Sequence, residues 1–336
     1  MAFANSTSGW MAFSPPGAPG VIEIAYTDSG GTSWTRTKRF QLPNPGAWAW
    51  APLGPGRLLV VVSSPSGTGT LNSVLTTTDH GQKWQAKPFH SAVAPGSLIT
   101  ATASGRAACV LVASDPGLSG VAAALYCGPD GGPWHQVATR FGDAPRGYLP
   151  GLFPNGLTLA GRQAWITGQN VSSGPDLLYA SSDSGRVFQP RSLPLPLATN
   201  ADTRPVVVGA GVPPALPVIA YAPSDASFVV YHQAGGGAWE PTTPLATHAN
   251  AGPPGAVLYS AVSPEMFFVR GQHTLYATTN GGTTWKAVSH PANAWSVMQF
   301  ATATQGWAVA GRATLLHTSD GGRTWTTVPM RVYRGA

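Results

Sequence analysis

The sequence predicts an all-β fold, a seven-bladed β-propeller built of four-stranded antiparallel blades. Three observations support this prediction. A short turn motif recurs seven times along the 336 residues, and each copy is flanked by short runs of β-forming residues. The 41 glycines and 32 prolines fall mostly at turn positions between these runs. No stretch of twelve residues keeps a helical period without a glycine or proline, so there is little room for helix.

The clearest copy of the motif is Thr318–Trp325, with the sequence Thr-Ser-Asp-Gly-Gly-Arg-Thr-Trp. Asp followed by Gly-Gly between two β-type runs predicts a tight hairpin turn. Glycine accepts a positive φ there, and the aspartate side chain can hydrogen-bond the backbone of its own turn. Seven aromatic residues end the copies: Trp34, Trp84, Trp134, Phe188, Trp239, Trp285 and Trp325. Their spacing of 40 to 54 residues, with several strands per repeat, is typical of propeller blades.

The seven copies differ in how much of the motif they keep. Glycine stands three residues before the aromatic residue in every copy. The four strongest copies also carry an acidic or amide residue five places before it, at Asp79, Asp183, Asn280 and Asp320. The copies that end at Trp34, Trp134 and Trp239 are degenerate at this position. Because the motif recurs with the blades, we expect these four residues to be structural parts of turns.

The repeat divides a single domain, 1–336, into seven blades. Their expected bounds are 1–43, 44–92, 93–142, 143–194, 195–244, 245–291 and 292–330. In each blade four strands run outward from the axis, and the motif joins the third strand to the fourth. The tail, 331–336, either completes the ring by adding to an outer edge or frays.

Apolar or alternating runs place the strands in order along the chain. Blade one is expected to hold strands near Ala2–Asn5, Trp10–Phe13, Val21–Tyr26 and Trp34–Phe40. Blade two holds Ala47–Trp50, Leu58–Val62, Val74–Thr77 and Trp84–Phe89, and blade three ends with Trp134–Phe141. Blade four begins at Tyr148, includes Ala164–Thr167 and Leu177–Ala180, and leads into a stiff connector at 190–196. Blade five holds Val206–Val208, Val218–Tyr221, Phe228–Tyr231 and Trp239–Thr242; blades six and seven run from 257 to 289 and from 297 to 328.

Two cysteines, Cys109 and Cys127, lie in neighbouring apolar runs joined by one loop at 114–120. The loop centre is midway between them, so they should face each other across an antiparallel hairpin, within reach of a disulfide. A disulfide would place the protein outside the cytoplasm. The alternative is a pair of free buried thiols.

Composition excludes several classes of function. The net charge of +6 comes from scattered basic residues, mostly arginine, without the basic clusters and interleaved aromatics of nucleic-acid binding. No apolar segment of 18 residues is present, so the sequence predicts no membrane span. The N-terminus lacks a signal-peptide pattern, and we expect that any signal or anchor preceded Met1 and was removed. The eight histidines do not converge on a metal-binding pattern, so no metal and no cofactor is predicted.

The motif Ser/Thr-x-Asp-x-Gly-x-Thr-Trp resembles the Asp-box, or bacterial neuraminidase repeat. This repeat is found in sialidases, xyloglucanases, sortilin-type receptors and photosystem II assembly factors, and the last copy is most similar to the assembly-factor-like group. The resemblance implies that the box is a structural turn between the third and fourth strands, remote from the ligand face. Any site is then expected on the opposite face.

Candidate binding residues are those that precede first strands or lie in loops between second and third strands. They are Trp48, Trp50, Arg146, Tyr148, Arg204, Arg270, Trp295 and Arg312. Planar aromatic rings stack on sugars or cations, and arginine forks bind carboxylate, sulfate or phosphate. The alternative is that the tryptophans pack between blades and the arginines pair with Asp143 and Asp202.

These observations favour a non-catalytic, extracytoplasmic binding or assembly module, expected to be monomeric, with an Arg/Trp-lined face for a protein partner or a glycan. The alternative function is a sialidase-like glycoside hydrolase, in which Arg146, Arg204, Arg270 and Tyr148 would converge. The Phe/Tyr-Arg-Ile-Pro motif of sialidases is missing before the first copy, and the chain has only three glutamates.

Overall fold

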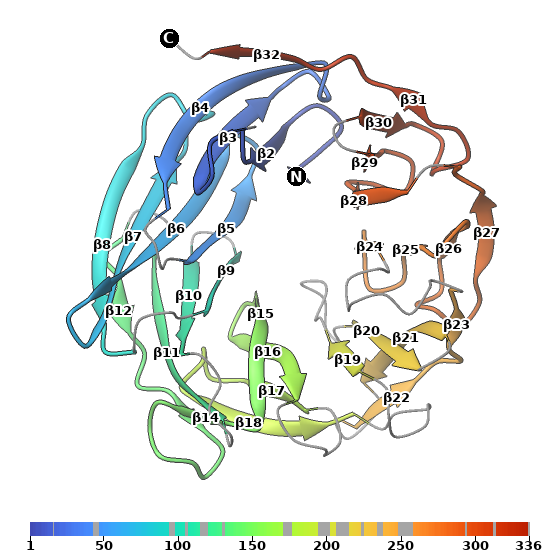
Figure 1. Cartoon of the computed structure of the whole chain (residues 1–336). Coiled ribbons are helices and arrows are strands. Elements are labelled where there is room, and N and C mark those ends of the chain that lie inside the picture. Colours follow the sequence, from blue (N-terminus) through green and yellow to red (C-terminus); the bar gives the residue numbers. More distant parts are fainter. Residues whose placement is uncertain are drawn as a thin grey trace.

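The computed structural model describes residues 1–15, 17–42, 47–93, 98–104, 107–114, 120–129, 132–170, 177–193, 202–205, 215–222, 225–233, 238–247, 258–292, 294–311 and 314–334. In this part of the chain the regular elements are all β-strands. They form seven sheets arranged as the blades of a ring, with the first strand of each blade nearest the axis (Figure 1). The predicted seven-bladed β-propeller is therefore confirmed.

The first three blades are numbered from the N-terminus. Blade 1 consists of β1 (Ala2–Phe3), β2 (Gly9–Phe13), β3 (Val21–Thr27) and β4 (Ser33–Gln41), with β32 (Arg331–Arg334) outside β4. Blade 2 consists of β5 (Ala47–Gly54), β6 (Arg57–Ser66), β7 (Gly69–Thr77) and β8 (Gln85–Ser91). Blade 3 consists of β9 (Leu98–Ser104), β10 (Ala107–Ala113), β11 (Gly120–Pro129) and two short outer strands, β12 (His135–Gln136) and β14 (Tyr148–Pro150).

Four further blades complete the ring. Blade 4 consists of β15 (Leu152–Ala160), β16 (Gln163–Asn170), β17 (Leu177–Ser181) and β18 (Val187–Ser192), with β13 (Arg140–Phe141) outside β18. Blade 5 consists of β19 (Asp202–Pro205), β20 (Ala215–Ala222), β21 (Asp225–Gln233), β22 (Trp239–Pro241) and β23 (Leu245–Ala246). Blade 6 consists of β24 (Leu258–Ala261), β25 (Phe267–Arg270), β26 (Leu275–Thr278) and β27 (Lys286–Ser289). Blade 7 consists of β28 (Trp295–Phe300), β29 (Gly306–Ala310), β30 (Thr314–Thr318) and β31 (Thr326–Thr327).

The hydrophobic core is divided among the spaces between neighbouring blades. Between blades 1 and 2, Trp10 and Ile24 pack with Leu58 and Val60, and all four are buried. Because a middle strand is covered on both faces, it is apolar nearly throughout, and every residue of β3 is buried. This packing explains why the middle strands appear in the sequence as continuous apolar runs.

Blade 7 and the tail close the ring against blade 1. The rings of Phe3 and Trp307 stack with their centroids 3.7 Å apart, and the side-chain amide of Gln299 donates to the carbonyl of Phe3 at 3.0 Å. The indole N–H of Trp307 donates to the carbonyl of Gly30 at 3.0 Å. Of the two outcomes expected for the tail, the structure shows pairing for 331–334, where β32 runs parallel to β4 on its outer side.

The outer strand of blade 3 differs from the prediction. The expected single strand Trp134–Phe141 is replaced by β12 and β14, which pair with opposite ends of β11, while β13 between them pairs in parallel with β18 of blade 4. The third copy of the motif has Pro129 where the strong copies have Asp or Asn. Proline offers no side-chain acceptor to hold the turn, so the chain does not continue into a full outer strand.

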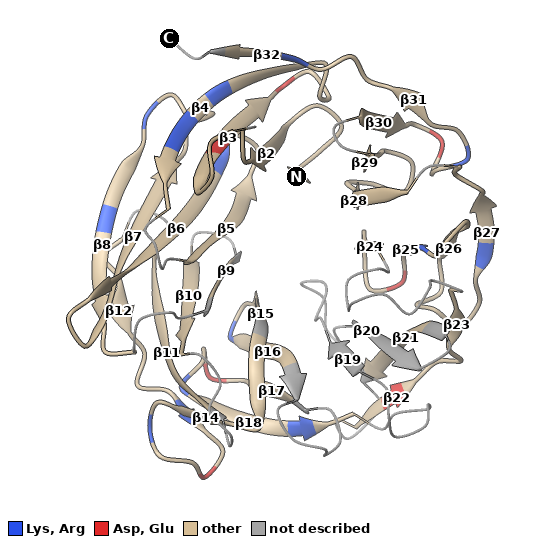
Figure 2. Cartoon of the chain, viewed as in Figure 1, with Lys and Arg blue, Asp and Glu red and all other residues tan. Residues whose placement is uncertain are grey.

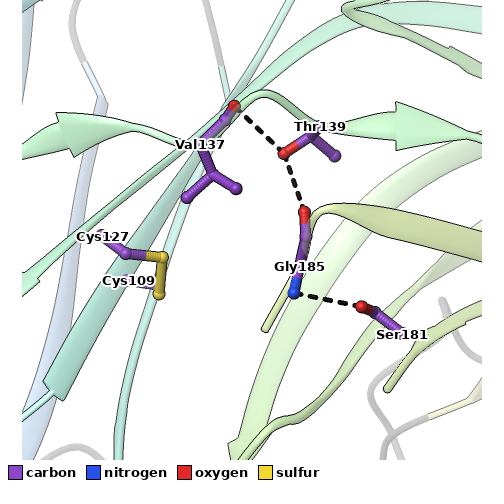
Figure 3. Close-up of a disulfide and its surroundings, with 6 residues drawn as sticks. All are labelled: Cys109, Cys127, Val137, Thr139, Ser181 and Gly185. Carbon is purple, nitrogen blue, oxygen red and sulfur yellow. Dashed lines mark hydrogen bonds between the residues drawn. A yellow bond between two sulfur atoms is a disulfide. The ribbon is translucent and has the colours of Figure 1, made fainter. Parts of the chain in front are cut away.

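The cysteines form the predicted disulfide. Cys109 on β10 is directly opposite Cys127 on β11, with their Cα atoms 4.2 Å apart and their sulfur atoms bonded. The bond lies beside the junction of blades 3 and 4 (Figure 3). There the hydroxyl of Thr139 donates to the carbonyl of Gly185 at 3.0 Å, so the connection after β12 is tied to the turn of the next blade.

Candidate functional site

The repeated turns use their polar side chains internally. In the last copy the hydroxyl of Thr318 donates to Asp320 at 2.8 Å and accepts from the amide of Gly322 at 2.9 Å. Asp320 also accepts from the amide of Thr324 at 3.0 Å and from its hydroxyl at 2.7 Å. The Thr324 hydrogen bonds lower the pKa of Asp320 to about 2. Its carboxylate therefore stays ionised and engaged in the turn.

The same arrangement recurs in four other copies. A threonine or serine hydroxyl accepts from the glycine amide four residues later, at 3.0 to 3.1 Å, in the turns that contain Gly31, Gly81, Gly185 and Gly282. In the first turn Ser29 replaces the acidic residue, and its hydroxyl accepts from the amide of Ser33 at 3.0 Å. This copy is degenerate in sequence but keeps the hydrogen bonds of the turn, because a serine hydroxyl can supply the acceptor that a carboxylate supplies elsewhere.

The structure brings together two of the predicted site residues, Arg270 and Trp295. Arg270 ends β25 and is only 4% exposed. Its guanidinium donates to the carbonyls of Gly271 and of Pro291, the latter at 3.1 Å, and its Cζ atom lies 5.3 Å from the ring centroid of Trp295. Burial lowers the pKa of Arg270, but an arginine stays protonated in proteins. A buried cation thus joins blade 6 to the start of blade 7.

Trp295 and its neighbours form a mixed aromatic and polar corner. The half-buried indole of Trp295 meets Trp325 edge to face, with ring centroids 4.7 Å apart. The hydroxyl of Thr274 and Nδ1 of the exposed His290 are 3.1 Å apart. This corner lies at the β25–β26 loop, at the opposite end of β26 from the repeated turn. We call the side of the ring that carries residues 271–274 and 290–292 the loop face.

The other predicted residues are not gathered at this corner. Trp48 and Trp50 lie in β5 and are partly buried in the cluster between blades 1 and 2. Tyr148 lies in β14, which pairs with β11 on the outer side of blade 3, and Arg146 is exposed just before it. We predicted that blade four begins at Tyr148; this is corrected, because Arg146 and Tyr148 lie on the outer side of the ring, beside blade 3. Arg204 is described only as backbone of β19, and Arg312 lies outside the described residues.

Two hollows were not predicted from the sequence. One, of about 330 Å³, lies between the middle of β11 and the 137–139 segment, and Arg146 lines it. The other, of about 450 Å³, lies between the repeated turns of blades 6 and 7, with Met266 and Phe268 among its apolar residues and Lys286 and Arg323 as its cations. The repeated motif marks turns within single blades, and no local motif marks a space between two blades.

The three glutamates lie on separate parts of the molecule. Glu23 on β3 is buried, with Oε2 at 3.1 Å from Nε of Arg36. Glu240 is exposed on the outer strand β22, and Glu265 is exposed in the turn between β24 and β25, where it accepts from the hydroxyl of Ser263 at 3.0 Å. No two of them share a cleft of the kind that paired-carboxylate hydrolysis uses.

The described residues contain no group of three or more His, Cys, Asp or Glu side chains placed to hold a metal ion. Nor do they include a helix of the length and apolarity needed to cross a membrane.

Comparison with known proteins identifies similar solved structures. No protein-family model matches the chain, and no curated protein matches it. The structure of YCF48 bound to D1 peptide is similar with a TM-score of 0.59 and 15% identity, over 94% of this chain and 89% of that one. YCF48 from Cyanidioschyzon merolae has a TM-score of 0.53 and 14% identity, over 95% and 88%. The GH74 enzyme of Niastella koreensis has a TM-score of 0.52 and 13% identity, over 99% of this chain and 55% of the enzyme. At these identities the likeness shows a shared β-propeller fold.

Proposed function

We propose that this protein is a non-catalytic binding or assembly module that works outside the cytoplasm and offers its loop face to a protein partner or a glycan. The observation that carries the proposal is the Arg270–Trp295 corner, where a buried cation supports a half-buried indole beside exposed polar groups. Such a corner combines an aromatic surface with hydrogen-bonding side chains, which suits a sugar ring or a peptide segment.

Arg270 acts here as a support. Its guanidinium is held by two backbone carbonyls, so it fixes the position of the Trp295 ring. The groups that contact a ligand are the open part of the indole and the exposed side chains of His273 and His290. The remaining predicted residues, Trp48, Trp50, Arg146, Tyr148, Arg204 and Arg312, stay proposals for wider contacts.

Three further features support the proposal. The repeated turns have the hydrogen bonds expected of Asp-boxes, so we infer that the chain is an Asp-box propeller whose boxes are structural. A similar fold, YCF48, has been solved with a bound peptide, which supports a role in holding a protein segment. The disulfide between Cys109 and Cys127 supports a location in an oxidising compartment.

The test is binding of the intact protein to arrays of glycans and of short peptides. We expect at least one glycan or peptide to bind, and we expect this binding to be lost in Trp295→Ala and weakened in His290→Ala. Because His290 is exposed, its replacement leaves the hydrophobic core intact. The matched control is His135→Ala, the same truncation of an exposed histidine on β12 of blade 3, which should bind as the natural chain does. Unchanged binding in both loop-face variants would refute the site.

The hydrolase alternative is tested on the same preparations with a fluorogenic sialoside. We expect no release of fluorophore above a buffer blank. Turnover that is abolished by Tyr148→Phe or Arg204→Ala would overturn the non-catalytic proposal, because a binding module has no turnover for these side chains to support.

A further inference from the structure

Basic side chains gather on the outer side of blades 1 and 2. Figure 2 shows them along β4, β8 and β32. We call β4, β8, β32 and the turn that leads into β8 the outer wall, and its described residues include six cations: Arg36, Lys38, Arg39, Lys83, Lys87 and Arg331. They include three of the four lysines in the whole chain. The wall therefore concentrates charge that looked scattered along the sequence.

Most acidic side chains of this region already have partners within the protein. Glu23 is buried beneath the wall, 3.1 Å from Nε of Arg36 and 4.0 Å from Nε of Arg39. Asp79 accepts from the amide of Lys83 at 2.9 Å within its own turn. Arg39 keeps 64% of its side chain exposed despite the ion pair. The surface that a partner meets is thus net positive.

An exposed apolar pair lies on the edge strand of the same wall. Val332 is 41% exposed and Tyr333 is 51% exposed, and they are two of the three exposed large hydrophobic residues in the described part of the chain. In the parallel register Val332 is beside Trp34 and Tyr333 is beside Thr35, so their side chains point to opposite faces of the sheet.

The backbone of β32 has one edge paired and one edge open. β32 is the last strand of its five-stranded sheet, and no described strand pairs with its outer side. The amide of Arg331 donates inward to the carbonyl of Thr32 at 3.2 Å. Backbone groups alternate sides along a strand, so the amide and carbonyl of Val332 point outward. An exposed edge of this kind is a template for strand pairing.

We propose that the outer edge of β32 is a docking site for an extended acidic segment of a partner protein, which adds to blade 1 as a sixth strand. Strand addition supplies backbone hydrogen bonds, and alternate side chains supply specificity. Apolar residues of the segment cover Val332 on one face and Tyr333 on the other, while its carboxylates meet the cations of the wall. A flat anionic surface such as a membrane would contact only one face of the blade 1 sheet. A partner strand can contact both Val332 and Tyr333, so the arrangement favours a strand as the partner. This site is separate from the loop face and does not depend on it.

The experiment measures the fluorescence anisotropy of a labelled octapeptide with the repeat Glu-Val-Val-Glu, which presents valine and glutamate on both faces of a strand, added to the whole protein at physiological ionic strength. We expect Lys38→Glu, on the strand that β32 pairs with, combined with Arg331→Glu to weaken binding by about tenfold or more, since two favourable charge contacts become repulsive. Tyr333→Ser should weaken the affinity for the peptide severalfold, because one half-exposed apolar contact is lost. The matched control, Arg162→Glu with Arg186→Glu, makes the same change in net charge on exposed residues of blade 4 and should leave binding nearly unchanged.

Two further probes separate strand addition from general attraction. The same peptide with alternate backbone amides methylated keeps its charge but cannot complete a strand ladder, so it should bind weakly. His290→Ala, on the loop face, should bind the acidic peptide normally, so that failure here and failure of the proposed function are distinguishable. Equal losses in the outer-wall and blade 4 variants, equal binding of the methylated peptide, or no effect of Tyr333→Ser would overturn the proposal. So would binding to phosphatidylglycerol vesicles in place of the peptide, because the partner would then be a membrane.

Discussion

Gly322 lies in the last repeated turn with a φ of +87°, and its Cα faces a filled space between blades 6 and 7. A methyl group added there would overlap Cδ2 of Leu275 and lie 3.3 Å from Cζ of Phe300. Leu275 is fully buried, so it has little room to move aside. Gly161 is a matched control, because its φ is +60° and a methyl group added to it would meet nothing within 4 Å. Alanine at the two positions therefore separates backbone strain from steric overlap.

The expected loss in the free energy of unfolding has two parts, backbone strain and overpacking. An L-residue in the left-handed region costs roughly 1–2 kcal/mol, offset by about 0.4–1 kcal/mol because alanine restricts the unfolded chain. Gly161→Ala should therefore lower the free energy of unfolding by about 1 kcal/mol. Gly322→Ala carries the same backbone cost plus roughly 1–3 kcal/mol for overpacking against Leu275. Its total should be about 2–4 kcal/mol.

Urea unfolding followed by tryptophan fluorescence measures both changes, provided that the dependence on urea concentration is the same for each variant. The double variant Gly322→Ala with Leu275→Ala is the sharpest check. Removing the overlapping methyl groups should make the double variant less destabilised than the sum of the two single changes. Equal costs at Gly322 and Gly161, or strict additivity with Leu275→Ala, would refute the steric argument.

Two other predictions concern the polar turn and the disulfide. The pKa of Asp320 is about 2 in the folded protein against 3.8 for the free group, so its contribution to stability is present above about pH 4 and is lost as the pH falls towards 2. Asp320→Asn should be tolerated at pH 7 and should lose this part of the acid sensitivity, because Asn280 makes the equivalent hydrogen bonds in blade 6. Asp320→Ala should clearly lower the urea concentration at the midpoint of unfolding. Equal midpoints for the two variants would contradict this prediction. Replacing Cys109 and Cys127 by alanine should lower the free energy of unfolding by about 3 kcal/mol, given their separation of 18 residues. Urea unfolding of the variant and of the oxidised protein measures the difference. An unchanged midpoint would show that the bond does not stabilise the fold.

Features that depend on short separations along the chain could be predicted from the amino-acid sequence. Five of the repeated turns are closed within eight residues by a hydroxyl, an acceptor and a glycine, and the glycine and the aromatic residue recur in all seven copies, so the repeats can be counted from the sequence. The disulfide also follows from local order, because a single loop joins the two strands and sets their register. These local rules were enough to count the blades and to place most of the strands.

Contacts between side chains of different blades could not be predicted from the sequence and became visible in the folded chain. Arg270 and Trp295 are in contact because the connection from β27 returns the chain to the axis beside the end of β25. Arg146 and Tyr148 lie on the outer side because β14 pairs with β11, a choice that no repeat pattern records. The outer wall depends on β32 crossing from blade 7 to blade 1, which joins residues almost 300 positions apart along the chain. The physical reason is that a repeat constrains contacts within a blade, whereas contacts between blades depend on side chains that differ from one copy to the next.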